Sequence, residues 1–243
     1  VYTVTVIDAN GCNQSISVTV ENGIELTLSV DITDVSCFGA GDGMINVTGG
    51  SIPPSLYYWS GNGNSTIGNP AAPLAAGQYT VTVVFSNGCS SSFTYDVTQP
   101  TALELTTSML SPVLCHDDVT GSIQAQGNGG TPNYNYTWST GANTSIVNEL
   151  GAGTYTVTLS DDNGCDVVDV IQLGNPDALG IEMSTTGVTC VGDRNGLIQV
   201  TGFGGSTTLG LYEYSIDGVN YQSGYLFPNL ATGTYTVYIR DNN

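Results

Sequence analysis

The stretch TYTVTLSDDNGC, residues 154–165, decides the fold. Threonines alternate with apolar residues, which is the period-two pattern of a β-strand, and the Asn-Gly pair that follows predicts a hairpin turn. Similar stretches begin at Tyr2, Tyr79 and Tyr235. With Tyr155, these tyrosines follow one another at intervals of 77, 76 and 80 residues, so the stretch marks a module that recurs along the chain.

The positions of the markers predict that the chain consists of four pieces. Residues 1–22 are the C-terminal hairpin of a preceding repeat, residues 23–100 and 101–176 are whole repeats, and residues 177–243 form a repeat that lacks its last strand. Each whole repeat reads as six or seven short strands with Gly-rich turns and no helical periodicity. This pattern predicts an all-β tandem array of immunoglobulin-like or fibronectin-like β-sandwiches.

Composition and charge exclude several classes of partner. The chain has twenty-one acidic residues and only two basic ones, Arg194 and Arg240, which gives a net charge of −19. Such a chain repels nucleic acid and anionic membrane surfaces, and no run of 18 apolar residues predicts membrane insertion. The acidic surface keeps long extracellular arrays from sticking to one another. The chain starts within a strand and stops before an expected Gly-Cys, which is typical of a window from a longer protein.

Aromatic residues recur at fixed places in the modules. The Leu-x-x-Gly-x-Tyr pattern before each marker strand resembles a tyrosine corner, in which the hydroxyl bonds back to the backbone near the preceding turn. We expect this role for Tyr79, Tyr155 and Tyr235. Trp59 and Trp138 are expected in the cores of their modules.

The order of motifs in each module resembles the SprB-type repeat of Bacteroidetes surface adhesins, named after the gliding-motility adhesin. The motifs are a cysteine, a Gly/Asp loop, Gly-Gly, Tyr-x-Trp-Ser, and the marker ending in Asn-Gly-Cys. Two departures, Ser86-Asn87 in one turn and Ile216 in place of tryptophan, affect turns and packing. The resemblance implies a very long protein on the outer membrane of a Gram-negative bacterium, exported by the type IX system and active in adhesion or gliding.

The cysteines also follow the repeat. One lies before each Gly/Asp loop and one after each Asn-Gly turn, namely Cys12, Cys37, Cys89, Cys115, Cys165 and Cys190. Constant placement in a lysine-free chain of secreted type predicts disulfides rather than a metal site, because no pair has the close spacing of zinc ligands.

Three pairings of these cysteines are open. Pairing within modules gives Cys37–Cys89 and Cys115–Cys165; pairing across linkers gives Cys12–Cys37, Cys89–Cys115 and Cys165–Cys190. In a seven-stranded sandwich both would join opposite poles about 25 Å apart, whereas a disulfide needs Cα atoms within about 7 Å. The third option joins the loop of one module to the hairpin of the next, as Cys37–Cys165. We favour pairing within modules, because a repeat that folds alone gains most from its own disulfide.

The acids of the Gly/Asp loops are the candidate metal ligands. Calcium takes several carboxylate and carbonyl oxygens, and Asp42, Asp117, Asp118 and Asp193 are the available carboxylates. Their spacing matches neither an EF-hand nor a nonapeptide repeat, so turn residues and no cofactor are the favoured interpretation. The single histidine, His116, builds no Ser-His-Asp set, and nothing indicates an enzyme.

The sequence therefore predicts a mechanical spacer whose partners are the neighbouring repeats of the same chain. Two alternatives stay open. In one, the modules themselves bind polysaccharide or a solid surface, with exposed aromatics as stacking platforms; the candidates are Tyr57, Tyr58, Tyr134, Tyr221 and Tyr225, most of which we expect in the core or in cross-strand pairs. In the other, the chain is an accessory region of a secreted hydrolase.

Overall fold

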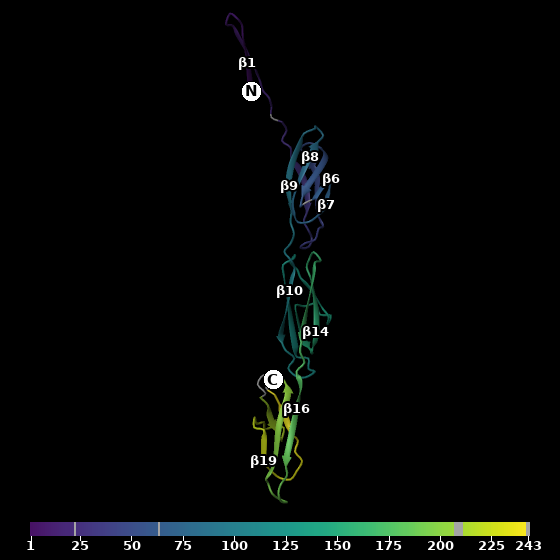
Figure 1. The fold of residues 1–243 in the computed structure, drawn as a ribbon, viewed down its shortest axis with the longest axis vertical. Coiled ribbons are helices and arrows are strands. Elements are labelled where there is room, and N and C mark those ends of the chain that lie inside the picture. The colour runs from purple at the N-terminus through teal and green to yellow at the C-terminus, as the bar shows by residue number, and fades with distance from the viewer. Residues whose placement is uncertain (22, 63, 207–210, 242–243) are drawn as a thin grey trace. The chain divides into compact units, whose positions relative to one another are not determined.

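A computed structural model describes residues 1–21, 23–62, 64–206 and 211–241 (Figure 1). Throughout these ranges every regular element is a β-strand. The chain divides into two compact units, Val1–Pro100 and Thr101–Asn243. We call residues 23–100 module 1, residues 101–176 module 2 and residues 177–243 module 3.

The first unit begins with a hairpin of β1 (Tyr2–Ile7) and β2 (Asn13–Val18), in which Tyr2 lies opposite Val18. Its turn is held by the Asp8 carboxylate, which accepts bonds from the backbone N–H groups of Asn10 and Cys12, both at 2.9 Å. Every residue of the two strands is exposed. A two-stranded hairpin without a covered face is marginally stable in water.

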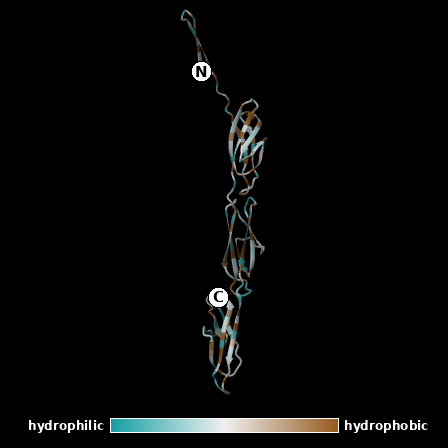
Figure 2. Ribbon diagram, viewed as in Figure 1, coloured by the Kyte–Doolittle hydropathy of each residue, from teal (hydrophilic) through white to brown (hydrophobic). Residues whose placement is uncertain are grey.

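Module 1 is a sandwich of two sheets, with strand orders β3-β4-β7 and β6-β5-β8-β9. Its strands are β3 (Leu28–Thr33), β4 (Gly43–Gly50), β5 (Pro54–Gly61), β6 (Asn64–Ile67), β7 (Ala71–Leu74), β8 (Gly77–Phe85) and β9 (Ser90–Val97). One continuous core joins residues of both sheets. The alternation of apolar and polar residues along these strands can be followed in Figure 2.

The marker strand β8 shows why the sequence pattern builds a sandwich. Val81 and Val83 point into the core and are fully buried. Thr80 and Thr82 lie on the opposite face, where their hydroxyls bond to Thr94 at 3.0 Å and to Ser92 at 2.8 Å on β9. The period of two therefore gives this strand one dry face and one hydrogen-bonded outer face.

Modules 2 and 3 make up the second unit and repeat this plan with separate cores. Module 2 has the sheets β10-β11-β13 and β12-β14-β15, built from β10 (Glu104–Ser111), β11 (Gly121–Asn128), β12 (Asn135–Trp138), β13 (Ile146–Leu150), β14 (Gly153–Ser160) and β15 (Asp166–Leu173). Module 3 has the sheets β16-β17-β19 and β18-β20, built from β16 (Asp177–Thr186), β17 (Gly196–Gly205), β18 (Glu213–Ser215), β19 (Leu226–Leu230) and β20 (Tyr238–Arg240).

The predicted fold class is confirmed: the chain is an all-β tandem array of immunoglobulin-like sandwich repeats. No helix in the described part of the chain is long and apolar enough to cross a membrane.

Candidate functional site

The tyrosine hydroxyls before the marker strands make the same contact in all three modules. Tyr79 donates to the carbonyl of Ala75 at 3.0 Å, Tyr155 to that of Gly151 at 2.8 Å, and Tyr235 to that of Ala231 at 3.1 Å. Each acceptor lies four residues before its tyrosine, in the turn that leads into the strand. The bond fixes this turn on the sandwich, which is a structural task.

The tryptophans of modules 1 and 2 are buried core residues. Trp59 is 3% exposed and donates its indole N–H to the carbonyl of Gly68 at 2.7 Å. Trp138 is 2% exposed and donates to the carbonyl of Thr144 at 2.9 Å. In module 3 the described core contains the buried aromatic residues Tyr214 and Phe227, and Ile216 is partly buried against it.

The Gly/Asp loop after each first strand opens with a tight turn at its cysteine. In each turn the backbone N–H three residues after the cysteine bonds to the cysteine carbonyl, as the pairs Ala40–Cys37 at 3.0 Å, Asp118–Cys115 at 3.1 Å and Asp193–Cys190 at 3.1 Å show. The residue two after the cysteine has a positive φ: Gly39 at 76°, Asp117 at 59° and Gly192 at 96°. Aspartate is one of the few residues with a side chain that tolerates this conformation.

A side-chain oxygen further along closes each loop. The acceptors Asp42, Thr120 and Asn195 receive the backbone N–H of the residue six positions earlier, at 3.0, 2.9 and 3.2 Å. The position thus needs an oxygen acceptor and does not need a charge. Sequence reasoning missed this position in modules 2 and 3, because three different residue types occupy it.

The candidate calcium ligands are engaged in these turns. The side-chain hydroxyl and then the backbone N–H of Ser36 bond to Asp42, and they lower the pKa of its carboxyl below the ordinary value. Asp193 accepts from the Thr189 hydroxyl at 2.8 Å, and Asp118 accepts from the N–H of Val119 at 2.8 Å. The described residues contain no cluster of three or more potential metal ligands. Calcium binding stays a prediction, and these contacts do not favour it because the carboxylates already accept hydrogen bonds within their own loops.

The same loop holds the start of the linker. Gly39 donates its N–H to the side-chain carbonyl of Gln99 at 2.8 Å. In module 2, Asp117 and Asn175 exchange two bonds, from the N–H of Asp117 to the Asn175 carbonyl oxygen at 3.0 Å and from the Asn175 amide to the Asp117 carboxylate at 2.9 Å. Gln99 and Asn175 each precede a proline. We call this arrangement the linker clamp.

His116 belongs to the linker clamp of module 2. Its Nδ1 lies 2.7 Å from the carbonyl oxygen of Pro176, and its Nε2 lies 3.4 Å from the carboxylate of Asp117. A carbonyl oxygen only accepts, so Nδ1 is the donor in the bond to Pro176. The histidine therefore fastens a second linker residue to the loop.

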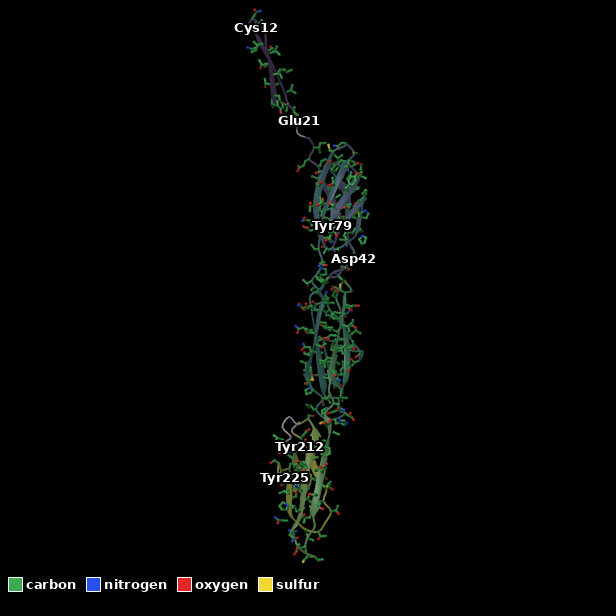
Figure 3. All side chains as sticks on the ribbon, in the orientation of Figure 1. Cys12, Glu21, Asp42, Tyr79, Tyr212 and Tyr225 are labelled. Atoms are coloured by element: carbon green, nitrogen blue, oxygen red, sulfur yellow. The ribbon has the colours of Figure 1, made fainter. Side chains whose placement is uncertain are left out.

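The cysteines correct the pairing that the sequence favoured. Cys37 and Cys165 are disulfide-bonded, while Cys12, Cys89, Cys115 and Cys190 carry free thiols on exposed residues. Cys12 lies at the tip of the N-terminal hairpin (Figure 3). Pairing within modules would use Cys89 and Cys115, and pairing across linkers would use all four of these cysteines, so both pairings are wrong. The third pairing, Cys37–Cys165, uses no cysteine that carries a free thiol, and it stays a prediction.

The geometry of module 1 explains this correction. The loop that contains Cys37 bonds to Gln99, just after β9, and Asp42 of this loop lies toward the same end of the sandwich as Tyr79 (Figure 3). Cys89 comes just before β9, which is eight residues long. A strand of this length spans about 26 Å, far beyond the 7 Å or so that a disulfide allows.

A second feature absent from the sequence reasoning joins the marker turn to the Gly-Gly pair. Asp161 is 7% exposed, and its Oδ2 accepts the N–H of Thr131 at 2.8 Å, next to Gly130. A Cβ on Gly130 would lie 2.5 Å from this oxygen, and the φ of +57° also favours glycine. In module 3, Asp241 accepts from Ser206 at 3.0 Å beside Gly205 in the same way. We call these arrangements the glycine-aspartate locks.

The charge of Asp161 is stabilised by its surroundings. Burial disfavours the ionised form, but backbone N–H groups outweigh burial and lower the pKa of the carboxyl below its ordinary value. The donors are Thr131, Cys165, Asn163 and Gly164. In module 1 the equivalent residue is Phe85, which is 1% exposed and belongs to the core. There Asn87 accepts the N–H of Cys89 at 3.0 Å, and Gly49 and Gly50 lack positive φ.

Few of the candidate stacking aromatics are exposed. Tyr58 is 44% exposed and Tyr225 is 55% exposed. Tyr57 and Tyr134 are half-buried, and the hydroxyl of Tyr134 bonds to the carbonyl of Gly129 at 2.6 Å. Tyr221 is half-buried beneath the guanidinium of Arg240, 4.1 Å from the ring centre.

Comparison with protein families supports the repeat interpretation. The model described as SprB repeat matches residues 29–64, 107–143 and 183–220. The chain contains three SprB repeats. Each match begins within the first strand, runs through the cysteine loop, the second strand and the third strand, and leaves the marker hairpin outside. The chain is accordingly a repeat region of the extracellular adhesin type.

Comparison with solved structures returns immunoglobulin-type proteins at low similarity. Three N-terminal domains of the outer capsid protein Hoc of bacteriophage RB49 are 19% identical, with a TM-score of 0.40, and the match covers 77% of this chain and 74% of that one. A Dscam structure is 11% identical with a TM-score of 0.26, covering 98% of this chain and 76% of that one. Scores this low carry no functional argument. No curated protein sequence matches the chain.

Proposed function

We propose that these SprB repeats form a load-bearing spacer in a long cell-surface adhesin that acts in surface adhesion or gliding. The adhesin would be attached to the outer membrane of a Gram-negative bacterium and exported by the type IX system. The spacer has no catalytic role and no cofactor. Its partners are the neighbouring repeats of the same chain.

The observation that supports this proposal is the linker clamp. An unrestrained linker behaves as a flexible coil and lets the domains on either side swing. Here the residue before the proline is bonded to the cysteine loop of the preceding module, at Gln99 in module 1 and at Asn175 in module 2. The proline that follows has its own φ fixed by its ring. The clamp thus removes freedom at the step where a stalk would otherwise bend.

The path of tension through a module supports the same function. The end of the first strand is tied to the end of the last strand in module 1, where Val35 donates its N–H to the carbonyl of Thr98 at 3.0 Å and Thr98 donates to Asp34 at 2.7 Å. In module 2, Thr107 on β10 donates to Asp169 on β15 at 2.8 Å. Force that enters through the first strand can therefore leave through the last one without crossing the whole core.

An array of immobilised polysaccharides tests whether the repeats bind a ligand themselves. We expect no saturable binding by the 243-residue chain. Saturable binding that is lost in both Tyr58→Ala and Tyr225→Ala, but retained in an exposed non-aromatic control such as Gln172→Ala, would contradict the spacer and favour a binding array. Both tyrosines are exposed, so their removal leaves the cores intact.

A further inference from the structure

Module 1 contains a cavity of about 230 Å³ at the side of its sandwich. Its described lining comes from the end of β5, from β6, from β7 and the turn that follows, and from Tyr79 on β8. Strands β6 and β7 are edge strands of different sheets, and they lie on the same side of the module (Figure 1). The cavity therefore opens in the gap between the edges of the two sheets.

Two aromatic residues of the core form the inner wall of this cavity. Trp59 is 3% exposed and Tyr79 is 4% exposed, and both line the cavity. Their donor groups are already used, because the indole N–H of Trp59 bonds to the carbonyl of Gly68 at 2.7 Å and the hydroxyl of Tyr79 bonds to that of Ala75 at 3.0 Å. The two rings therefore offer an occupant apolar surface rather than free donors.

The outer wall is made of small, uncharged residues. Ala72, Pro73 and Ala75 are exposed on β7 and in the turn after it. On β6, Thr66 lies opposite Trp59, so the two side chains share one face of the sheet. Within the described part of the chain the hydroxyl of Thr66 makes no hydrogen bond, and no described lining residue is charged. One polar group is thus available at the mouth of an apolar cavity.

Module 2 shows how a repeat fills this place from its own chain. The segment after Trp138 turns back, so that the Trp138 N–H bonds to the carbonyl of Ala142 at 2.9 Å, and Ala142 packs against the core that contains Trp138. In module 1 the segment after Trp59 pairs with β5 as β6 instead. Its apolar residue Ile67 lies opposite Tyr58 on the outer face and is 71% exposed. The space beside Trp59 is left open.

The size and charge of the cavity define the class of occupant. It is larger than the cavity of about 150 Å³ that holds benzene and smaller than the roughly 300 Å³ at which pockets for drug-sized ligands begin. It has room for one substituted ring. An anion is repelled by a chain of net charge −19, and a cation would lose its hydration without gaining a carboxylate. A sugar ring would lose hydrogen bonds to water that one threonine hydroxyl cannot replace.

We propose that this cavity of module 1 binds an uncharged aromatic ring of the phenol type, carried by a tyrosine side chain or by a free small compound. The ring packs against Trp59 and Tyr79, in the offset or edge-to-face arrangements that aromatic pairs favour. Thr66 is the polar group available to its hydroxyl. The proposal goes beyond the spacer function, because it gives one module of the array a ligand that module 2, filled by Ala142, does not take.

Titration of the 243-residue chain with p-cresol, followed by NMR at the indole N–H signals of its two tryptophans, tests the proposal. The signal of Trp59 should shift saturably, because the bound ring changes its surroundings. The signal of Trp138 should stay in place and is the internal control. Methyl glucoside at the same concentrations should shift neither signal. The proposal is overturned if p-cresol leaves Trp59 unchanged or shifts both tryptophans alike.

Two substitutions on β6 separate the cavity from the outer surface. Thr66→Phe places a ring on the cavity face and should reduce the shift of Trp59 roughly tenfold or more, because the cavity is then filled from within. Ile67→Phe places the same ring on the opposite face and should bind p-cresol like wild type. Both positions are exposed, so melting curves should show both variants folded. Wild-type binding by Thr66→Phe would overturn the proposal.

The blocked peptide acetyl-Thr-Tyr-Thr-amide distinguishes the two sources of the ring. Tighter binding of the peptide than of p-cresol identifies a partner strand, since the outer edge of β6 has no neighbour in the described sheet and can accept backbone bonds. Weaker binding of the peptide identifies a free small aromatic compound. If neither probe binds, the proposal is overturned, while the spacer function, which needs no ligand, is unaffected.

Discussion

Modules 1 and 2 close their cores in the same way with different side chains, and the comparison shows what the last strand contributes to an SprB repeat. In module 2, β15 brings Leu173 against Gly121 and covers Val113 and Val157. In module 1, β9 brings Val97 against Gly43, and Val35 is buried in the same core. The family match ends before the marker hairpin in every module, yet the core is completed by that hairpin.

Removing the closing side chain of module 2 should produce the largest effect. Leu173→Ala leaves a cavity between Gly121 and Val113, and it should lower the free energy of unfolding of this module by about 2–5 kcal/mol. Thermal or urea unfolding followed by circular dichroism measures the change. Gln172→Ala, on the exposed face of the same strand, is the control and should change stability little; equal effects of the two substitutions would refute the closing role of Leu173.

The glycine-aspartate lock gives a prediction of intermediate size. Asp161→Ala leaves the N–H groups of Thr131, Asn163 and Cys165 without their carboxylate acceptor, and it should destabilise module 2 by about 1–3 kcal/mol. Asp166→Ala, an exposed residue at the start of β15, is the matched control. Calorimetry of both variants decides the matter, and a wild-type melting temperature for Asp161→Ala would show that the lock is dispensable.

The same lock predicts a dependence of stability on pH. The pKa of Asp161 is depressed in the folded state, so folded chains bind fewer protons than unfolded ones near the ordinary value of 3.8. Its contribution is present above that value and is lost as the pH falls below it. Asp217, whose pKa is lowered mainly by the side chain and backbone N–H of Asn220, acts in the same direction in module 3.

Melting curves recorded from neutral pH to below about pH 4 measure this dependence. Asp161→Asn retains an oxygen acceptor but cannot titrate, so module 2 of this variant should lose less stability than wild type as the pH falls. Module 1 has Phe85 at this position and serves as an internal comparison. An identical acid response in wild type and Asp161→Asn would contradict the assignment.

The architecture could be predicted from the sequence because each strand alternates and each marker returns at a near-constant interval. The tyrosine and tryptophan environments follow from residue type, since a large aromatic with one polar atom seeks both burial and a partner. The favoured pairing of cysteines within modules was wrong, because pairing depends on which pole of the sandwich each loop occupies. The loop closure at Asp42, Thr120 and Asn195 could not be predicted either, because any residue with a side-chain oxygen acceptor can make this bond.

The linker clamp should have the smallest effect on global stability, because its groups are exposed. Asn175→Ala should change the free energy of unfolding by less than about 1 kcal/mol. It should nevertheless speed hydrogen exchange at the amide of Asp117 by roughly tenfold, since this N–H loses its acceptor. Asn163→Ala in the marker turn is a control that leaves the clamp intact, and unchanged exchange at Asp117 in Asn175→Ala would argue against the clamp.

The central claim is that the repeats bear load and that the last strand closes the load path. Single-molecule pulling between the two ends of the chain, in reductant, tests this most directly. We predict discrete unfolding events for modules 1 and 2, with Leu173→Ala lowering the unfolding force of module 2 and leaving that of module 1 unchanged. Extension without discrete events, or an unchanged unfolding force of module 2 in Leu173→Ala, would contradict the claim.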